Sequence, residues 1–254
     1  MSTGSKQYRA EGSGPLLIYV AGLDGTGQLF FKQSSRLTSH YRVVTFRSRE
    51  NEKFTYDDLT GDLAGIIRDI GEQKAIIVGE SFGGTVALSF ALRYPQMVER
   101  LVVVNSFPRF RKRLTINLGI KLSSGMFNGL WPLRRAANRL GLAIDGVSFT
   151  DRERFWTAIR TVSPGAYTQR LRLIRELNLD SRLHEIRVPT LFIAGDRDLV
   201  VPSVKEAQIM AARIPNAKVK IVKGAGHACL LGNLVRLDEL LFESSDSADV
   251  TNAT

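Results

Sequence analysis

Short apolar runs alternate along the chain with longer segments in which apolar residues recur at helical spacing. These runs are rich in Val, Ile and Leu and are bounded by Gly or polar residues. They predict six strands, over residues 16–21, 42–46, 75–78, 101–105, 190–194 and 218–222. Nearly continuous apolar strands are typical of a parallel sheet that helices cover on both faces. With right-handed crossovers, the pattern predicts an α/β fold with a doubly wound, mostly parallel sheet.

Helices are predicted between these strands wherever one face of a segment is apolar. The clearest is residues 56–70, in which Leu59, Leu63 and Ile67 share a face. Further helices are expected after the third strand up to Pro95, over residues 203–213, and over residues 232–242 before a polar tail that is expected to fray.

Between the fourth and fifth strands the alternation breaks. Residues 114–133 are apolar but interrupted by glycines, and helical patterns follow over residues 151–162 and 166–177. We therefore expect a helical cap, residues 107–187, inserted over the carboxyl ends of the strands. Residues 1–106 and 188–254 then form the core domain.

The composition is that of a globular protein, with 44% hydrophobic and 24% charged residues among 254. A single cysteine, Cys229, excludes an intramolecular disulfide framework and a multi-thiolate metal site. No apolar stretch approaches the roughly 18 residues that a bilayer-spanning helix needs. The first residues also lack the apolar region of a secretory signal, so a cytoplasmic location is expected.

The net charge of +10 lies entirely in the expected cap. Residues 109–187 contain 16 Lys and Arg but 6 Asp and Glu, whereas the rest of the chain is balanced. This charge is either a solvated helical face or a surface that contacts anionic membrane head groups through residues such as Arg134, Arg135 and Arg139. No nucleic-acid partner is expected, because no DNA- or RNA-binding motif accompanies the charge.

A candidate nucleophile lies between the third predicted strand and the helix that follows it. Gly79, Glu80, Ser81, Phe82 and Gly83 fit the pattern G-x-S-x-G, which places a serine on a tight strand-to-helix turn with its hydroxyl exposed. The amide of Phe82, directly after the serine, is then one expected donor to an oxyanion. The pattern alone is weak, but its position between a strand and a helix is the context that the chemistry requires.

A serine nucleophile needs a histidine base and an acid that orients the base. Of the three histidines, His227 follows the last predicted strand in a glycine-flanked loop, and it is the expected base. Two acids, Asp196 and Asp198, follow the fifth strand. Asp198 is favoured because it lies further out and can reach the histidine, whereas Asp196 more readily turns the loop.

Together these residues resemble the α/β-hydrolase superfamily over residues 15–242. The resemblance implies Ser81 as nucleophile, Asp198 as acid, His227 as base, and the amides of Leu23 and Phe82 as the oxyanion hole. Ala21 and Gly22 stand where many members have His-Gly, which leaves open how the oxyanion loop is braced.

Within the superfamily, two short motifs are similar to the esterase/lipase-like part of phytyl ester synthases and diacylglycerol acyltransferase-like proteins. They are residues 22–27 and 79–84. The spacing of the glycines in residues 22–27 differs from a dinucleotide-binding loop, so no nucleotide is expected. No metal or organic cofactor is implied.

The sequence therefore predicts a serine hydrolase of carboxylic esters that forms an acyl-enzyme on Ser81, with a medium-length acyl or lipid-like substrate. Two alternatives remain: an acyltransferase or thioesterase that uses the same triad, and a non-catalytic ligand-binding module on the same fold. The residues expected to contact substrate are Asp24, Met126, Phe127, Trp131 and Trp156.

Overall fold

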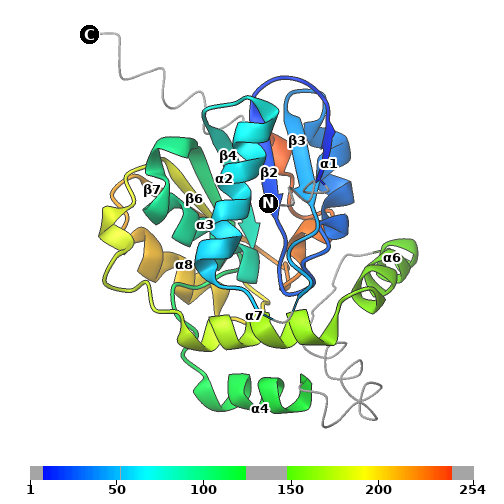
Figure 1. Cartoon of the computed structure of the whole chain (residues 1–254), viewed down its shortest axis with the longest axis vertical. Coiled ribbons are helices and arrows are strands. Elements are labelled where there is room, and N and C mark those ends of the chain that lie inside the picture. Colours follow the sequence, from blue (N-terminus) through cyan, green and yellow to red (C-terminus); the bar gives the residue numbers. More distant parts are fainter. Residues whose placement is uncertain (1–7, 52, 124–147, 242–254) are drawn as a thin grey trace, which may run out of the picture.

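The computed structural model describes residues 8–51, 53–123 and 148–241. The described chain forms a seven-stranded sheet in the order β1-β3-β2-β4-β5-β6-β7 (Figure 1). Its strands are β1 Tyr8–Glu11, β2 Leu16–Val20, β3 Arg42–Phe46, β4 Ala75–Glu80, β5 Val98–Val104, β6 Thr190–Gly195 and β7 Ala217–Val222. All neighbouring pairs are parallel except β1 with β3, which is antiparallel. The mostly parallel α/β sheet expected from the sequence is confirmed.

Helices cover both faces of this sheet. The helices of the described chain include α1 Phe31–Leu37, α2 Tyr56–Ile70, α3 Phe82–Arg93, α4 Arg113–Ser123, α6 Phe149–Arg160, α7 Pro164–Glu176 and α8 Ser203–Ala211. On one face, α2, α3 and α8 pack against side chains such as Ile77 and Val103. On the other, α1 and the helical residues 237–241 pack against the alternate positions Ile76 and Val102.

Local sequence signals explain where the longest of these helices, α2, begins and ends. Thr55 accepts a hydrogen bond from the Asp58 amide, and the Asp58 carboxylate accepts one from the Thr55 amide, which forms a capping box. Gly71 ends the helix with a φ of 84°, a left-handed conformation that glycine adopts without strain. The helix buries Leu59, Leu63 and Ile67, as its apolar periodicity predicts.

Three features differ from the sequence-based expectation. β1 is an additional edge strand, and α1 is an additional helix of seven residues. The last helix begins at residue 237 instead of residue 232, because a 3-10 turn and bends occupy the chain before it.

The helices α4, α6 and α7 lie between β5 and β6 in the chain and gather at one end of the sheet (Figure 1). α7 also packs against α4 and contacts α3 of the core. Among the helices of the described residues, none combines the length and the apolar character that crossing a bilayer requires.

Candidate active site

Ser81 lies on a sharp turn between β4 and α3. Its backbone has φ 54° and ψ −119°, a strained conformation for a residue with a side chain. The turn is held by a hydrogen bond from the Ser81 amide to the Val104 carbonyl and by one from the Ser106 hydroxyl to the Ser81 carbonyl. A Cβ at Gly83 would lie 2.0 Å from the Val20 carbonyl oxygen, so this close approach requires glycine.

The side chains of Ser81, His227 and Asp198 form a continuous hydrogen-bonded chain. His227 Nε2 lies 2.9 Å from Ser81 Oγ, and its Nδ1 lies 2.8 Å from Asp198 Oδ2. A carboxylate only accepts hydrogen bonds, so Nδ1 carries the proton in the neutral ring and Nε2 is left to accept from the serine. This is the proton arrangement that a general base for Ser81 requires.

Asp198 is fixed by donors on both of its oxygens. Oδ1 accepts from the amides of Val200 and Val201, and Oδ2 accepts from the Ser203 hydroxyl as well as from His227. Burial by itself would raise the pKa of Asp198, but these hydrogen bonds, that from His227 above all, hold it below its ordinary value. Asp198 is therefore an anion beside His227 at neutral pH.

The competing acid, Asp196, lies elsewhere. Its carboxylate is exposed and accepts a hydrogen bond from the Gly224 amide, which fastens the start of the histidine loop. The structure thus gives the two acids different tasks, and it is Asp198 that faces the imidazole.

Asn105, at the end of β5, also holds the loop that carries His227 through hydrogen bonds. Asn105 Nδ2 donates to the carbonyls of Gly226 and His227, at 3.0 and 2.8 Å, while its Oδ1 accepts from the Gly195 amide. A single buried amide side chain therefore ties the end of β6 to the histidine loop.

Glu80, the residue directly before the nucleophile, is a second carboxyl group at this site. It accepts a hydrogen bond of 2.8 Å from the hydroxyl of Tyr19, a fully buried residue of β2. Burial raises the pKa of Glu80 from 4.5 to about 7, against the lowering effect of the Tyr19 hydrogen bond and of His227.

Two cavities meet at Ser81 and share Leu23, Tyr167 and Val200 in their walls. The smaller lobe, about 180 Å³, also contains His227 and is closed by Leu29 and by residues of α6. The larger lobe, about 320 Å³, runs between α4 and α7 and is lined mainly by apolar side chains. Its walls include Phe107, Phe110, Ile116, Gly119, Leu122, Leu171 and Ile174.

Of the five residues that the sequence analysis proposed for substrate contact, two line a cavity at Ser81 and three lie outside the described residues. Trp156 of α6 and Asp24 both line the smaller lobe. Asp24 is buried, however, and its carboxylate accepts from the amide and the hydroxyl of Thr26, so it shapes its own loop. Met126, Phe127 and Trp131 lie outside the described residues, as do Arg134, Arg135 and Arg139.

The two predicted oxyanion donors belong to two different segments that border the nucleophile. Phe82 is the first residue of α3, and the partial positive charge of a helix start favours an anion there. Leu23 lies in the loop after β2 and lines both lobes.

Residues at the site that were not predicted include Glu80, Asn105, Tyr167 and Arg170. Glu80 occupies the variable position of the elbow motif, and no local signal marks it as buried. Tyr167 and Arg170 lie three positions apart on α7, the spacing that puts side chains on one face of a helix. This spacing is the only sequence signal that would have found them.

Comparison with known proteins places this site in a family. The family model described as serine aminopeptidase, S33, matches residues 50–233, which is more than half of the chain. The chain belongs to the serine aminopeptidase S33 family. The α/β-hydrolase superfamily inferred from the sequence motifs is confirmed, and so is the broad class of hydrolase.

Relatives of this S33 family member include named esterases and other hydrolases. The pimeloyl-[acyl-carrier protein] methyl ester esterase of Xanthomonas oryzae is 29% identical over 243 residues, which cover 91% of this chain and 94% of that protein. A protein named for carbamate hydrolysis, RutD of Serratia proteamaculans, is 26% identical, with 89% of each chain covered. The bromoperoxidase structure from Bacillus anthracis superposes with a TM-score of 0.82 at 22% identity, covering 92% of this chain and 93% of that one.

Proposed function

We propose that the protein is a serine hydrolase that cleaves carboxylic esters through an acyl-enzyme on Ser81. The observation that carries this proposal is the hydrogen-bonded chain from Ser81 through His227 to Asp198, which opens onto two largely apolar lobes. The methyl ester esterase among its relatives supports an ester as the substrate class. In this proposal α4, α6 and α7 belong to the cap of residues 107–187, set on a core of residues 1–106 and 188–254.

The reaction follows from the proton arrangement. Ser81 Oγ attacks the ester carbonyl while His227 Nε2 accepts its proton, and Asp198 stabilises the imidazolium that forms. The amides of Leu23 and Phe82 are assigned to hold the oxyanion, a contribution of roughly 10²–10³ in rate for one donor. His227 then protonates the leaving alcohol, and the same base activates water to release the acid from Ser81.

The position of His227 supports an assignment of the two lobes to the two parts of the substrate. A leaving alcohol must lie near Nε2 to receive its proton, and His227 lines the smaller lobe but not the larger one. The alcohol part is therefore placed in the smaller lobe beside α6. The acyl chain is placed in the larger lobe between α4 and α7, whose apolar walls suit a medium-length chain.

We expect nitrophenyl esters of medium acyl chains to be better substrates than the acetate. Each additional methylene in an apolar pocket is worth about 1–3 kcal/mol, so kcat/KM for the octanoate should exceed that for the acetate by at least roughly tenfold. Gly119→Leu should reverse this order, because Gly119 lines the larger lobe and a Cβ there meets only Leu171, at 3.6 Å. A series of kcat/KM values over chain length measures both effects.

The matched control is Gly61→Leu on α2, where a Cβ would find open space and which lies in neither lobe. It should keep the wild-type order of substrates. A sharp preference for the acetate in the wild-type protein would contradict a long acyl lobe. Acylated alcohols among the products, when an alcohol is added, would favour acyl transfer over hydrolysis.

We also propose that α4 contacts an anionic lipid surface. Leu114 and Leu118 are 87% and 57% exposed on this helix, and the exposed Lys112 and Arg113 directly precede Leu114, a pattern that suits a membrane interface. Vesicles with phosphatidylglycerol should therefore bind the protein in sedimentation, and phosphatidylcholine vesicles should not. Added salt and the substitution Leu114→Glu should each weaken the binding. If the protein bound neither kind of vesicle, the membrane proposal would be wrong, but the proposal of ester hydrolysis would be unaffected. A cytoplasmic location remains a prediction from the sequence.

A further inference from the structure

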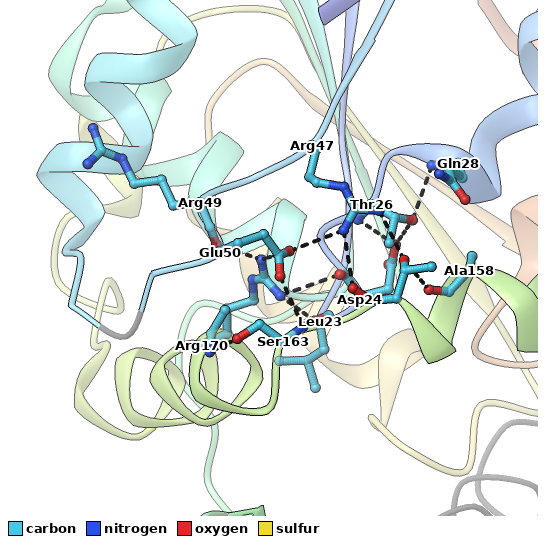
Figure 2. Close-up of polar contacts among 12 residues, drawn as sticks. Leu23, Asp24, Thr26, Gln28, Arg47, Arg49, Glu50, Ala158, Ser163 and Arg170 are labelled. Carbon is cyan, nitrogen blue, oxygen red and sulfur yellow. Dashed lines mark hydrogen bonds and ion pairs between the residues drawn. The ribbon is translucent and has the colours of Figure 1, made fainter. Parts of the chain in front are cut away.

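Arg170 of α7 is a fully buried guanidinium that reaches from the cap helix to the loop after β2 (Figure 2). Its Nη1 donates to the carbonyl oxygens of Leu23, at 3.0 Å, and of Asp24, at 3.4 Å. Its Nη2 donates to the Arg49 carbonyl, at 2.9 Å, and lies 3.4 Å from the Glu50 carboxylate. Most of its partners are therefore backbone carbonyls, and two of them belong to the proposed oxyanion loop.

The loop uses each of four consecutive carbonyls for a different hydrogen bond. The Gly22 carbonyl accepts from the Gly25 amide and closes a tight turn, and the Gly25 carbonyl accepts from the Ser48 amide. The two carbonyls between them, those of Leu23 and Asp24, face Arg170. The conformation of this turn is therefore set from both ends by the backbone and in its middle by the guanidinium.

This arrangement determines where the Leu23 amide points. In a trans peptide the carbonyl and the amide hydrogen point in opposite directions. The Gly22 carbonyl and the Leu23 amide belong to the same peptide. Because this carbonyl points into the turn and accepts from the Gly25 amide, the Leu23 amide points out of the turn. Arg170 fixes the following peptide as well, so the residue that carries the donor is restrained on both sides.

Gly25 shows how closely the guanidinium fits the loop. A Cβ at this position would lie 2.3 Å from Arg170 Nη2, and the backbone there has a φ of 64°. Only glycine allows the loop to adopt this bend while the guanidinium lies against it.

A contribution to stability does not by itself explain why a charged side chain is buried at position 170. Apolar residues of similar volume often replace buried charged groups at no cost to stability. A guanidinium presents several donors in a rigid plane, which suits the simultaneous capture of several carbonyls. The geometry favours a role in positioning the loop.

We propose that Arg170 is a positioning residue that braces the oxyanion loop, in which Ala21 stands at the place of the histidine of many superfamily members, and that through it α7 couples the cap to the oxyanion hole. This inference rests on the proposed ester hydrolysis. Glu50 also fixes the start of α7, because its carboxylate accepts a hydrogen bond from the amide of Ser163, the residue that precedes the helix. On the same helix, Tyr167 lines both substrate lobes. One helix therefore contacts the substrate cavity and restrains the donor loop.

The test compares Arg170→Met, which keeps the apolar stem, with Arg170→Lys, which keeps a charge but lacks the planar fork. A displacement of about 1 Å in a catalytic group can cost on the order of 10²-fold in rate. We expect kcat for a nitrophenyl ester to fall by roughly 10- to 100-fold in Arg170→Met, with KM changed less than about threefold. Arg170→Lys should lose less. Affinity for a boronic acid, whose adduct with Ser81 imitates the tetrahedral intermediate, should fall in parallel with kcat.

The control is Arg49→Gln, because the Arg49 side chain points away from the loop (Figure 2). It pairs with Asp62 of α2 instead. The variant should keep kcat and boronic acid affinity. Unchanged kcat in a folded Arg170→Met or Arg170→Lys, or an equal loss in Arg49→Gln, would overturn the inference. A wild-type protein without ester turnover would instead refute the proposed function, so the two failures are distinguishable.

Discussion

Ser81→Ala is expected to lower ester turnover by roughly 10⁵- to 10⁶-fold while the fold is retained. The substitution removes only the oxygen that His227 Nε2 contacts at 2.9 Å. No other hydroxyl in this hydrogen-bonded chain can replace it, because Ser203 donates to Asp198 Oδ2 and is separated from the position of Ser81 Oγ by the His227 ring. The measurement is kcat for a nitrophenyl butyrate, together with labelling by a fluorophosphonate, which should disappear.

Ser89→Ala provides the same chemical change within α3, the helix that follows Ser81. The Ser89 hydroxyl donates to the Thr85 carbonyl and is remote from both lobes. This variant should keep wild-type turnover and labelling. If Ser81→Ala retained turnover within tenfold of wild type, the acyl-enzyme mechanism would be wrong, and the non-catalytic alternative would gain weight.

Glu80→Gln is expected to change how stability depends on pH. In the folded protein the pKa of Glu80 is raised to about 7 by burial, whereas the ordinary value is 4.5. Between these values the folded state keeps a proton that the unfolded state releases. The contribution of Glu80 is therefore complete below about pH 4.5 and is lost as the pH rises through about 7, a change of about 3 kcal/mol at most.

Gln keeps an acceptor for the Tyr19 hydroxyl but cannot titrate. The free energy of unfolding in urea is measured for the wild type and for Glu80→Gln at about pH 5 and about pH 8. The difference between the two proteins isolates the effect of Glu80, because they share all other titrating groups. The stability of the wild type relative to Glu80→Gln should be lower at the higher pH. A difference that stays constant within about 0.5 kcal/mol would show that Glu80 is not a buried proton-binding group.

The sequence predicted the sheet well where its strands are buried on both faces. The five residues of β2 are all buried, and their continuous apolar run marks the strand directly. β1 was missed because its residues are mostly exposed at the sheet edge, so its sequence Tyr-Arg-Ala-Glu carries no apolar pattern. The seven-residue helix α1 is too short for a clear helical period.

The candidate triad could be predicted because its chemistry constrains residue types locally. A glycine-flanked serine after a strand, and a histidine in a glycine loop, are visible in the sequence. Choosing Asp198 over Asp196 needed an argument about reach, and the contacts of the two acids support that choice.

Arg170 could not be predicted in the same way. Its principal partners are backbone carbonyls, which any sequence presents, and they lie more than 120 residues away. The burial of Glu80 likewise depends on Tyr19, a residue of another strand 61 positions earlier. Contacts of this kind arise only when the chain is folded.

The placement of Asn105 has a consequence for protein engineering. Its amide joins the end of β6 to the histidine loop entirely within the sheet scaffold, without help from α4, α6 or α7. A chimera that carries the helices of another enzyme in place of α4, α6 and α7 should thus keep the nucleophile and the base aligned. Exchanging this one contiguous piece of the gene should transfer a new substrate range, as long as the incoming piece keeps an arginine at the position of Arg170.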